Sequence, residues 1–229
     1  MNYLCHAHLW LDRPWFAAGT ATPDWLGAVD RPARVRSRRA CEFVYDPDER
    51  MAQFARGIVQ HHHDDDWFHA TPRFAQIQFD IGAELKKVLP DDRSFRPSFA
   101  VHVLVELLLD AVLAEKRPGL LDRYYAAIRT VDAGEVEAFV NRMAPNPTQV
   151  LGGWIGRFVE EGFLYDYLDD PGLFRRLNHV LLRVRSTPLP EEALPTLAFA
   201  REQVRLHQGE LLAHLRDREA YGERCGLDR

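Results

Sequence analysis

The chain has 229 residues, of which 46% are hydrophobic and 28% charged, and its formal net charge is −5. This composition predicts a soluble globular protein, and the length suits a single domain, 1–229. The negative charge argues against a nucleic-acid partner. No apolar run reaches the roughly 18–20 residues that span a bilayer, so we expect no membrane span.

The N-terminus and the cysteines bear on the compartment. No basic residue precedes the first apolar stretch and no small-residue cleavage site follows it, which predicts a cytoplasmic protein. Cys5, Cys41 and Cys225 are an odd, scattered set without a CxxC pair. We therefore expect neither a disulfide framework nor a thiolate zinc site.

Apolar residues recur at spacings of three and four along most of the chain, and strict alternation is almost absent. This pattern predicts an all-α fold, a compact helical bundle. The predicted helices are 2–12, 47–66, 72–89, 97–116, 118–130, 133–144, 147–168, 171–185 and 191–221.

The opening decapeptide, MNYLCHAHLW, holds His6 and His8. They could begin a metal site, or they could be ordinary core and surface histidines. Residues two apart on a helix point about 200° from each other, so we expect only one of the two to face an ion. Asp24 follows Pro23 at an expected turn or helix start, where capping is the ordinary role and metal binding or catalysis the alternative.

The stretch 27–46 is rich in arginine and short of periodicity, which suggests an irregular insertion. It is either a solvated loop or a docking patch for something acidic, such as a phosphate or an acidic protein face. The candidate substrate-binding residues in it are Arg36, Arg38 and Arg39.

Two further stretches place ionisable residues on one helix face. In GIVQHHHDDDWFHA, His61, Asp65 and His69 recur every four residues, which suits either a metal site or a solvated helix end. In FAVHVLVELLLDAVLA, His102 and Glu106 are four apart among apolar residues. These two are a solvent-facing stripe, or they are ligands or proton carriers, with Glu106 a candidate general base.

The segment 190–229 is predicted to be a C-terminal helical extension. Its apolar residues have helical spacing, which favours packing against the core or a partner over a second metal site.

The sequence also resembles the acyl-carrier-protein phosphodiesterase family. MNYLCHAHL followed by AAGTATPDWL resembles its N-terminal signature, GIVQHHHDDD resembles its next motif, and HVLVELLLDAVLA and the stretch from Trp154 to Val184 resemble its later helices. The sequence departs from the family at His102, Glu106 and Leu107, where the family has an acid and an Asp-His pair. The positions that match the first two motifs are His6, His8, Gly19, Asp24, Gly57, Ile58, His61 and Asp65.

The resemblance implies an HD-domain-like metal phosphohydrolase that cleaves 4′-phosphopantetheine from holo-acyl carrier protein, the carrier of fatty acid biosynthesis. The implied cofactor is a divalent metal, Mn²⁺ first, although carboxylate and imidazole ligands also suit Mg²⁺, Fe and Zn²⁺. The expected metal ligands are His6, His8, Asp24, His61 and Asp65, and the expected catalytic residues are Glu106, His102 and Asp24.

Two alternatives remain open. The same fold and metal could serve a nucleotide or another small phosphate ester, or the chain could be a non-catalytic helical binding module. The oligomeric state has no signature in the sequence.

Overall fold

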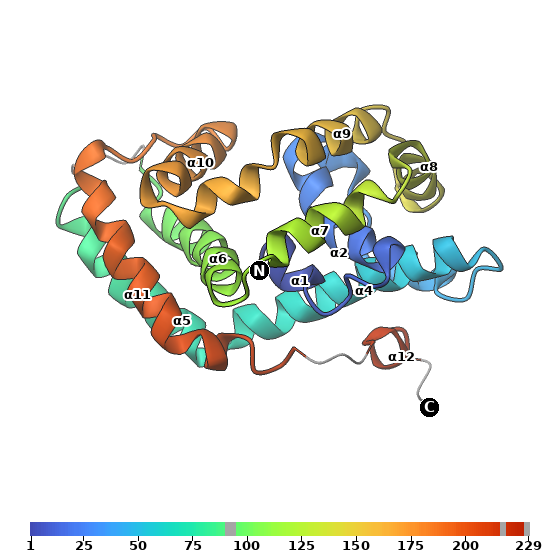
Figure 1. The fold of residues 1–229 in the computed structure, drawn as a ribbon, viewed down its shortest axis with the longest axis horizontal. Coiled ribbons are helices and arrows are strands. Elements are labelled where there is room, and N and C mark those ends of the chain that lie inside the picture. Colours follow the sequence, from blue (N-terminus) through green and yellow to red (C-terminus); the bar gives the residue numbers. More distant parts are fainter. Residues whose placement is uncertain (90–94, 216–218, 227–229) are drawn as a thin grey trace. The chain divides into compact units, whose positions relative to one another are not determined.

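The computed structural model describes residues 1–89, 95–215 and 219–226. All regular structure in these ranges is helical and they contain no strand, which confirms the all-α prediction (Figure 1). The chain forms two compact units. The first unit is Asn2–Asp66, Gly119–Gly162 and Leu215–Arg229, and the second is Met1, Trp67–Pro118 and Phe163–His214. The prediction of a single domain stays a prediction.

The first unit is built around α2 (Pro14–Val29), which packs against α1 (Tyr3–Ala7), α7 (Leu120–Arg129) and α9 (Leu151–Glu161). It also contains α8 (Ala133–Met143) and most of α4 (Glu49–Ala70). The shorter helices of this unit are η1 (Arg31–Ala33), α3 (Ser37–Ala40), η2 (Cys41–Phe43) and α12 (Tyr221–Arg224). Its core includes Phe16, Trp25, Tyr124 and Phe158, all almost fully buried.

Helices α2 and α4 touch backbone to backbone at a pair of glycines. A Cβ atom on Gly19 would lie 2.2 Å from the Phe54 carbonyl oxygen, and one on Gly57 would lie 2.2 Å from that of Phe16. Only glycine permits so close an approach. Thr20 follows Gly19, and His61 lies one turn after Gly57, so the crossing brings these two residues together.

The second unit contains α5 (Pro72–Lys86), α6 (Pro97–Lys116), α10 (Asp170–Arg183) and α11 (Leu194–Leu211). Helix α11 lies along α5 and α6, and η3 (Phe163–Leu168) packs on α6 and α10 (Figure 1). The short η4 (Glu191–Ala193) precedes α11. Buried Arg201 binds Asp170 at 2.8 Å and Glu115 at 2.7 Å, so this core contains a charged group with satisfied partners.

Helix α6 is long and apolar enough to cross a membrane by length and composition alone. Two thirds of its apolar window is buried inside the fold, as in the central helix of a helical core. Among the described residues it is the one candidate for a membrane span, and a weak one.

The predicted helices match the observed ones to within a few residues over α4 to α8 and α10, and differ elsewhere. Helix α2 was missed, and the predicted 147–168 is two elements, α9 and η3. The helix predicted at 2–12 ends at Ala7, and the predicted 191–221 is η4 followed by α11, which ends at Leu211. The stretch 27–46 is not irregular throughout, because η1, α3 and η2 lie in it. Part of the predicted 191–221, residues 216–218, lies outside the described residues.

The expectation that the cysteines form no disulfide was wrong. Cys41 and Cys225 form a disulfide across a sequence separation of 184, and Cys5 is a buried thiol outside that bond. The bond joins α3 and η2 to the segment that follows α12, and both cysteines belong to the first unit. A spacing rule does not detect such a pair, because the fold, not the sequence separation, brings the two residues together.

Candidate metal centre

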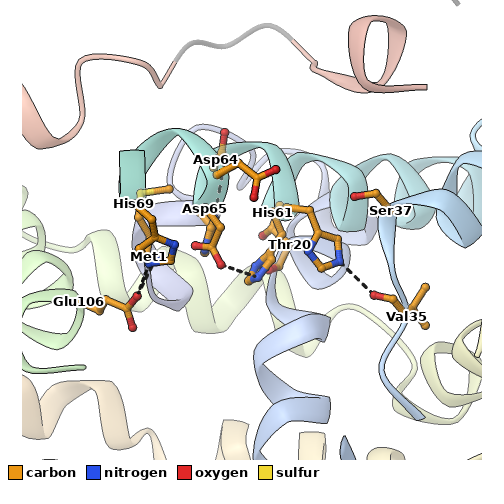
Figure 2. A network of polar contacts seen from close by, with 12 residues as sticks. Met1, Thr20, Val35, Ser37, His61, Asp64, Asp65, His69 and Glu106 are labelled. Carbon is orange, nitrogen blue, oxygen red and sulfur yellow. Dashed lines mark hydrogen bonds and ion pairs between the residues drawn. The ribbon is translucent and has the colours of Figure 1, made fainter. Parts of the chain in front are cut away.

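Helix α4 presents His61 and Asp65 on the same face, one turn apart, as their spacing predicts. The Nε2 atom of His61 lies 3.5 Å from Oδ2 of Asp65 (Figure 2). The His61 side chain is almost fully buried, whereas Asp65 is 27% exposed. The pair therefore lies at the edge of the first unit's core.

Helix α1 supplies the third member, His6, whose side chain is fully buried. Its Nε2 atom lies 3.3 Å from Oδ1 of Asp65, and its ring stacks on that of His61 with centroids 4.1 Å apart. One donor atom from each of His6, His61 and Asp65 lies within 4.8 Å of the others. We call these three residues the buried cluster.

Neighbouring groups fix the far side of each imidazole. The Nδ1 atom of His61 donates to the Thr20 carbonyl oxygen at 2.8 Å, which leaves Nε2 facing Asp65 (Figure 2). The Nδ1 atom of His6 lies 3.7 Å from Oδ2 of Asp64, whose Oδ1 accepts from Gln60 at 2.8 Å. A carbonyl or carboxylate behind an imidazole is the usual support of a metal-binding histidine.

The charges of the cluster are mutually stabilised. Burial alone would lower the pKa of His6, but Asp64 and Asp65 outweigh this effect and raise the pKa to about 9. Burial opposes ionisation of Asp65, yet positive charges, those of His61 and His6 among them, hold the pKa of Asp65 below its ordinary value. The cluster can therefore hold one positive charge between its carboxylates, either a proton on His6 or a metal ion.

Two features fit a metal better than a proton. Within the described part of the chain, neither ring nitrogen of His6 has a hydrogen-bond partner of good geometry, although both are buried. Ligands about 2.1 Å from a tetrahedral ion lie about 3.4 Å apart. Nε2 of His6 lies 3.3 Å from Oδ1 of Asp65 and Nε2 of His61 lies 3.5 Å from Oδ2, so each histidine is at about that spacing from one of the two carboxylate oxygens. His6, His61 and Asp65 therefore fit a divalent cation.

Asp24 lies inside α2, so its predicted place at a turn or helix start was wrong. Pro23 does not end the helix, which continues through it to Val29. Most side chains of α2 are buried, so the helix lies in the core. The Oδ2 atom of Asp24 is buried and has no hydrogen bond among the described residues. Burial raises the pKa of Asp24, against the opposing charges of His61 and His6. Asp24 is thus near the buried cluster but outside its three converging donors.

His8 does not join the cluster. It caps the C-terminus of α1, and its Nδ1 atom donates to the Cys5 carbonyl oxygen at 2.8 Å. The expectation that only one of the two opening histidines faces the site agrees with this placement.

The three candidate arginines lie at α3, Arg36 as the residue before it and Arg38 and Arg39 within it. All three are exposed. Arg38 also lines a hollow of about 410 Å³ together with Ser37, Cys41, Arg224 and Cys225. The hollow is separate from the residues of the buried cluster.

His102 and Glu106 belong to the second unit and meet His69 there, not His61. The Oε1 atom of Glu106 lies 3.0 Å from Nε2 of His69 (Figure 2). The same oxygen lies 3.2 Å from Nε2 of His102. We call His69, His102 and Glu106 the partly exposed cluster. The Met1 amino group also lies 3.2 Å from the same oxygen.

Sequence reasoning missed Asp64 and Thr20 as supporting groups and did not pair His69 with Glu106. Asp64 follows Gln60 by one helical turn, a spacing that predicts their hydrogen bond. Nothing in the sequence indicates the Thr20 carbonyl or the meeting of His69 with α6, because both depend on how distant segments pack.

No family model, curated protein or solved structure matches the chain.

Proposed function

We propose that this chain is a metal-dependent phosphodiesterase, similar to the acyl-carrier-protein phosphodiesterases, which releases 4′-phosphopantetheine from holo-acyl carrier protein. The observation that carries the proposal is the convergence of His6, His61 and Asp65 around one point, with His6 buried and its nitrogens unsatisfied. An HD-domain-like arrangement of the helices and a cytoplasmic location are parts of the same proposal. The Cys41–Cys225 disulfide is unusual for that compartment.

In this proposal, His6, His61 and Asp65 hold the metal and Asp24 stands behind them as a fourth ligand or a proton donor. Where Asp24 acts as the proton donor, three protein ligands remain. Three ligands are typical of catalytic rather than structural sites, because they leave a coordination position open. A divalent ion, Mn²⁺ in the first instance, supplies Lewis acidity at a phosphoryl oxygen and makes water more acidic. Thr20 and Asp64 orient the two imidazoles.

The hydrolysis adds water across the bond between phosphorus and the carrier's serine oxygen. Phosphopantetheine leaves with the oxygen of the water, and the serine regains a proton. Glu106 and His102 were predicted to carry that proton. This role stays a prediction, since both residues belong to the second unit.

The exposed arginines of α3 are proposed to bind the acidic face of the carrier or its phosphate. Reversal of their charge, Arg38→Glu with Arg39→Glu, is expected to raise KM and weaken its dependence on salt while kcat is unchanged. Arg123→Glu is the matched control, because Arg123 is an exposed arginine on α7 of the same unit. Equal KM values for the two variants would remove the arginines from the proposal.

A second candidate substrate, a nucleotide or another small phosphate ester, is favoured by the hollow beside Arg38 and Arg224. The guanidinium of Arg38 lines it, and such a group suits a phosphate. Arg224 and Ser37 line it as well, and there Arg224 donates to Ser37 and pairs with Asp66. The hollow is open to ligands much smaller than a carrier protein.

The deciding experiment incubates holo-acyl carrier protein with the purified chain and Mn²⁺, and measures the mass of the carrier. The wild type is expected to remove the prosthetic group, and Asp65→Asn to lose this activity. Asp12→Asn is the control, because Asp12 is an exposed carboxylate of the same unit. Hydrolysis of small phosphate esters alone would favour the second candidate. If the chain neither hydrolyses these substrates nor binds a metal, the remaining interpretation is a non-catalytic helical binding module.

A further inference from the structure

We infer that the partly exposed cluster, His69, His102 and Glu106, is a second metal site, one that takes a divalent transition ion of the Zn²⁺ class. The cluster lies wholly in the second unit and does not depend on the proposed function. One donor atom from each residue lies within 4.8 Å of the others.

The geometry of the donors supports an ion between them. Both Nε2 atoms approach the Glu106 carboxylate, at 3.0 Å from His69 and 3.2 Å from His102. The two imidazole rings stack with centroids 4.8 Å apart, so their nitrogens are presented side by side. Two imidazoles and one carboxylate form a ligand set found in catalytic zinc sites.

The elements around the cluster hold it in place. His102 and Glu106 are one turn apart on α6, and His69 lies in the last turn of α4. The ring of Phe74, which is buried in the core, contacts both histidines with centroids 5.3 Å from His69 and 5.2 Å from His102. A wall of this kind fixes the rotamers of both ligands before an ion arrives.

The charge of the cluster suits a cation. Burial works against ionisation of Glu106, but the Met1 amino group and the two histidines keep its pKa well below the usual range. The carboxylate is therefore ionised at neutral pH. The amino group of Met1 lies on the same oxygen, so an ion must share the carboxylate with it or displace it.

The cluster is also accessible to solvent. The side chains of His69 and His102 are 34% and 36% exposed, and that of Glu106 is 17% exposed. Three protein ligands leave a position for water or a small anionic ligand, and this exposure allows either to reach it.

Titration of the intact chain with Zn²⁺, followed by equilibrium dialysis, tests the inference. The wild type is expected to bind two ions, Glu106→Gln and His102→Gln one each, Asp65→Asn one, and the Glu106→Gln, Asp65→Asn double variant none. His207→Gln is the matched control. His207 also faces a carboxylate on its own helix, Glu210 at 3.1 Å, but belongs to no group of three converging donors among the described residues.

The outcomes separate this inference from the proposed function. An ion that Asp65→Asn retains and Glu106→Gln loses establishes the second site, whatever the buried cluster does. Two ions in both Glu106→Gln and His102→Gln, with circular dichroism matching the wild type, would overturn the inference. The inference would also be overturned if Glu106→Gln and His102→Gln bound as many ions as the control variant His207→Gln. The use of two different ligand variants protects the test from a single misfolded protein.

Discussion

The buried cluster and the partly exposed cluster each contain two imidazoles and one carboxylate, but the surroundings of these donors differ. In the buried cluster, His6 and His61 have almost no exposed side-chain surface, and a backbone carbonyl and a second carboxylate stand behind them. In the partly exposed cluster, the two histidines lie against Phe74 and face solvent. The first is therefore supported by polar groups, and the second by an aromatic wall.

This difference has a consequence for metal binding. Polar groups behind a ligand orient it and typically change metal affinity by about 10–100-fold. The buried cluster has two such groups, Asp64 and the Thr20 carbonyl, so we expect it to hold its ion more tightly. The partly exposed cluster should exchange its ion faster, because water reaches it more easily.

The largest expected effect on stability and metal binding comes from a change at the contact between Gly19 and Gly57, which positions only the buried cluster. Gly57→Ala places a Cβ atom 2.2 Å from the Phe16 carbonyl oxygen, so α2 and α4 must separate. We expect a loss of about 3 kcal/mol or more of stability in urea denaturation, together with loss of the more tightly bound ion. Gly156→Ala, in open space on α9, should leave stability unchanged or raise it by about 0.5–1 kcal/mol. Equal stability of the two variants would contradict the close backbone contact between α2 and α4.

Removal of the disulfide is the next largest change and again falls in the first unit. The Cys41→Ser, Cys225→Ser double variant is expected to lose about 2–4 kcal/mol, since the bond restricts the unfolded chain. Reductant should lower the wild type to the same stability and leave the variant unchanged, as measured by urea denaturation. A reductant effect on the variant, or none on the wild type, would show that the bond is absent.

His6 is a proposed metal ligand and His8 caps helix α1, so variants of the two should differ in metal binding. His6→Gln should abolish the tight ion, whereas His8→Gln should retain it and lose only about 1 kcal/mol with the hydrogen bond to Cys5. Metal affinity by competition with a chelator gives the comparison directly. Equal loss in both variants would return His8 to the ligand set.

The smallest perturbation is chemical modification of the unmutated chain. Diethyl pyrocarbonate should label His69 and His102 before His6 and His61, because only the first two have substantial exposed side-chain surface. Zn²⁺ should protect the first pair. Peptide mass spectrometry locates the labels, and faster labelling of His6 would contradict its burial.

Much of the fold could be predicted from the sequence, because amphipathic helices such as α8 and α10 bury one face and expose the other. Helix α2 escaped prediction for the opposite reason. Most of its residues are buried, so the apolar side chains form no stripe, and Pro23 resembles a boundary.

The candidate site could be predicted only in part, where its residues are close together in the sequence. His61 and Asp65 are brought together by one helical turn, a local relation that the sequence shows. His6 was suggested by its motif, but its contact with Asp65 depends on tertiary packing. The pairing of His69 with Glu106 is equally non-local, at a sequence separation of 37. Local periodicity does not determine such contacts.

Anomalous diffraction from crystals of the metal-loaded protein, measured at the absorption edge of the metal, tests the metal centre most directly. We predict a peak about 2.0–2.3 Å from Nε2 of His6, Nε2 of His61 and an Asp65 oxygen. A map without that peak, with His6 bonded to Asp64 and Asp65 through protons alone, would contradict the metal centre.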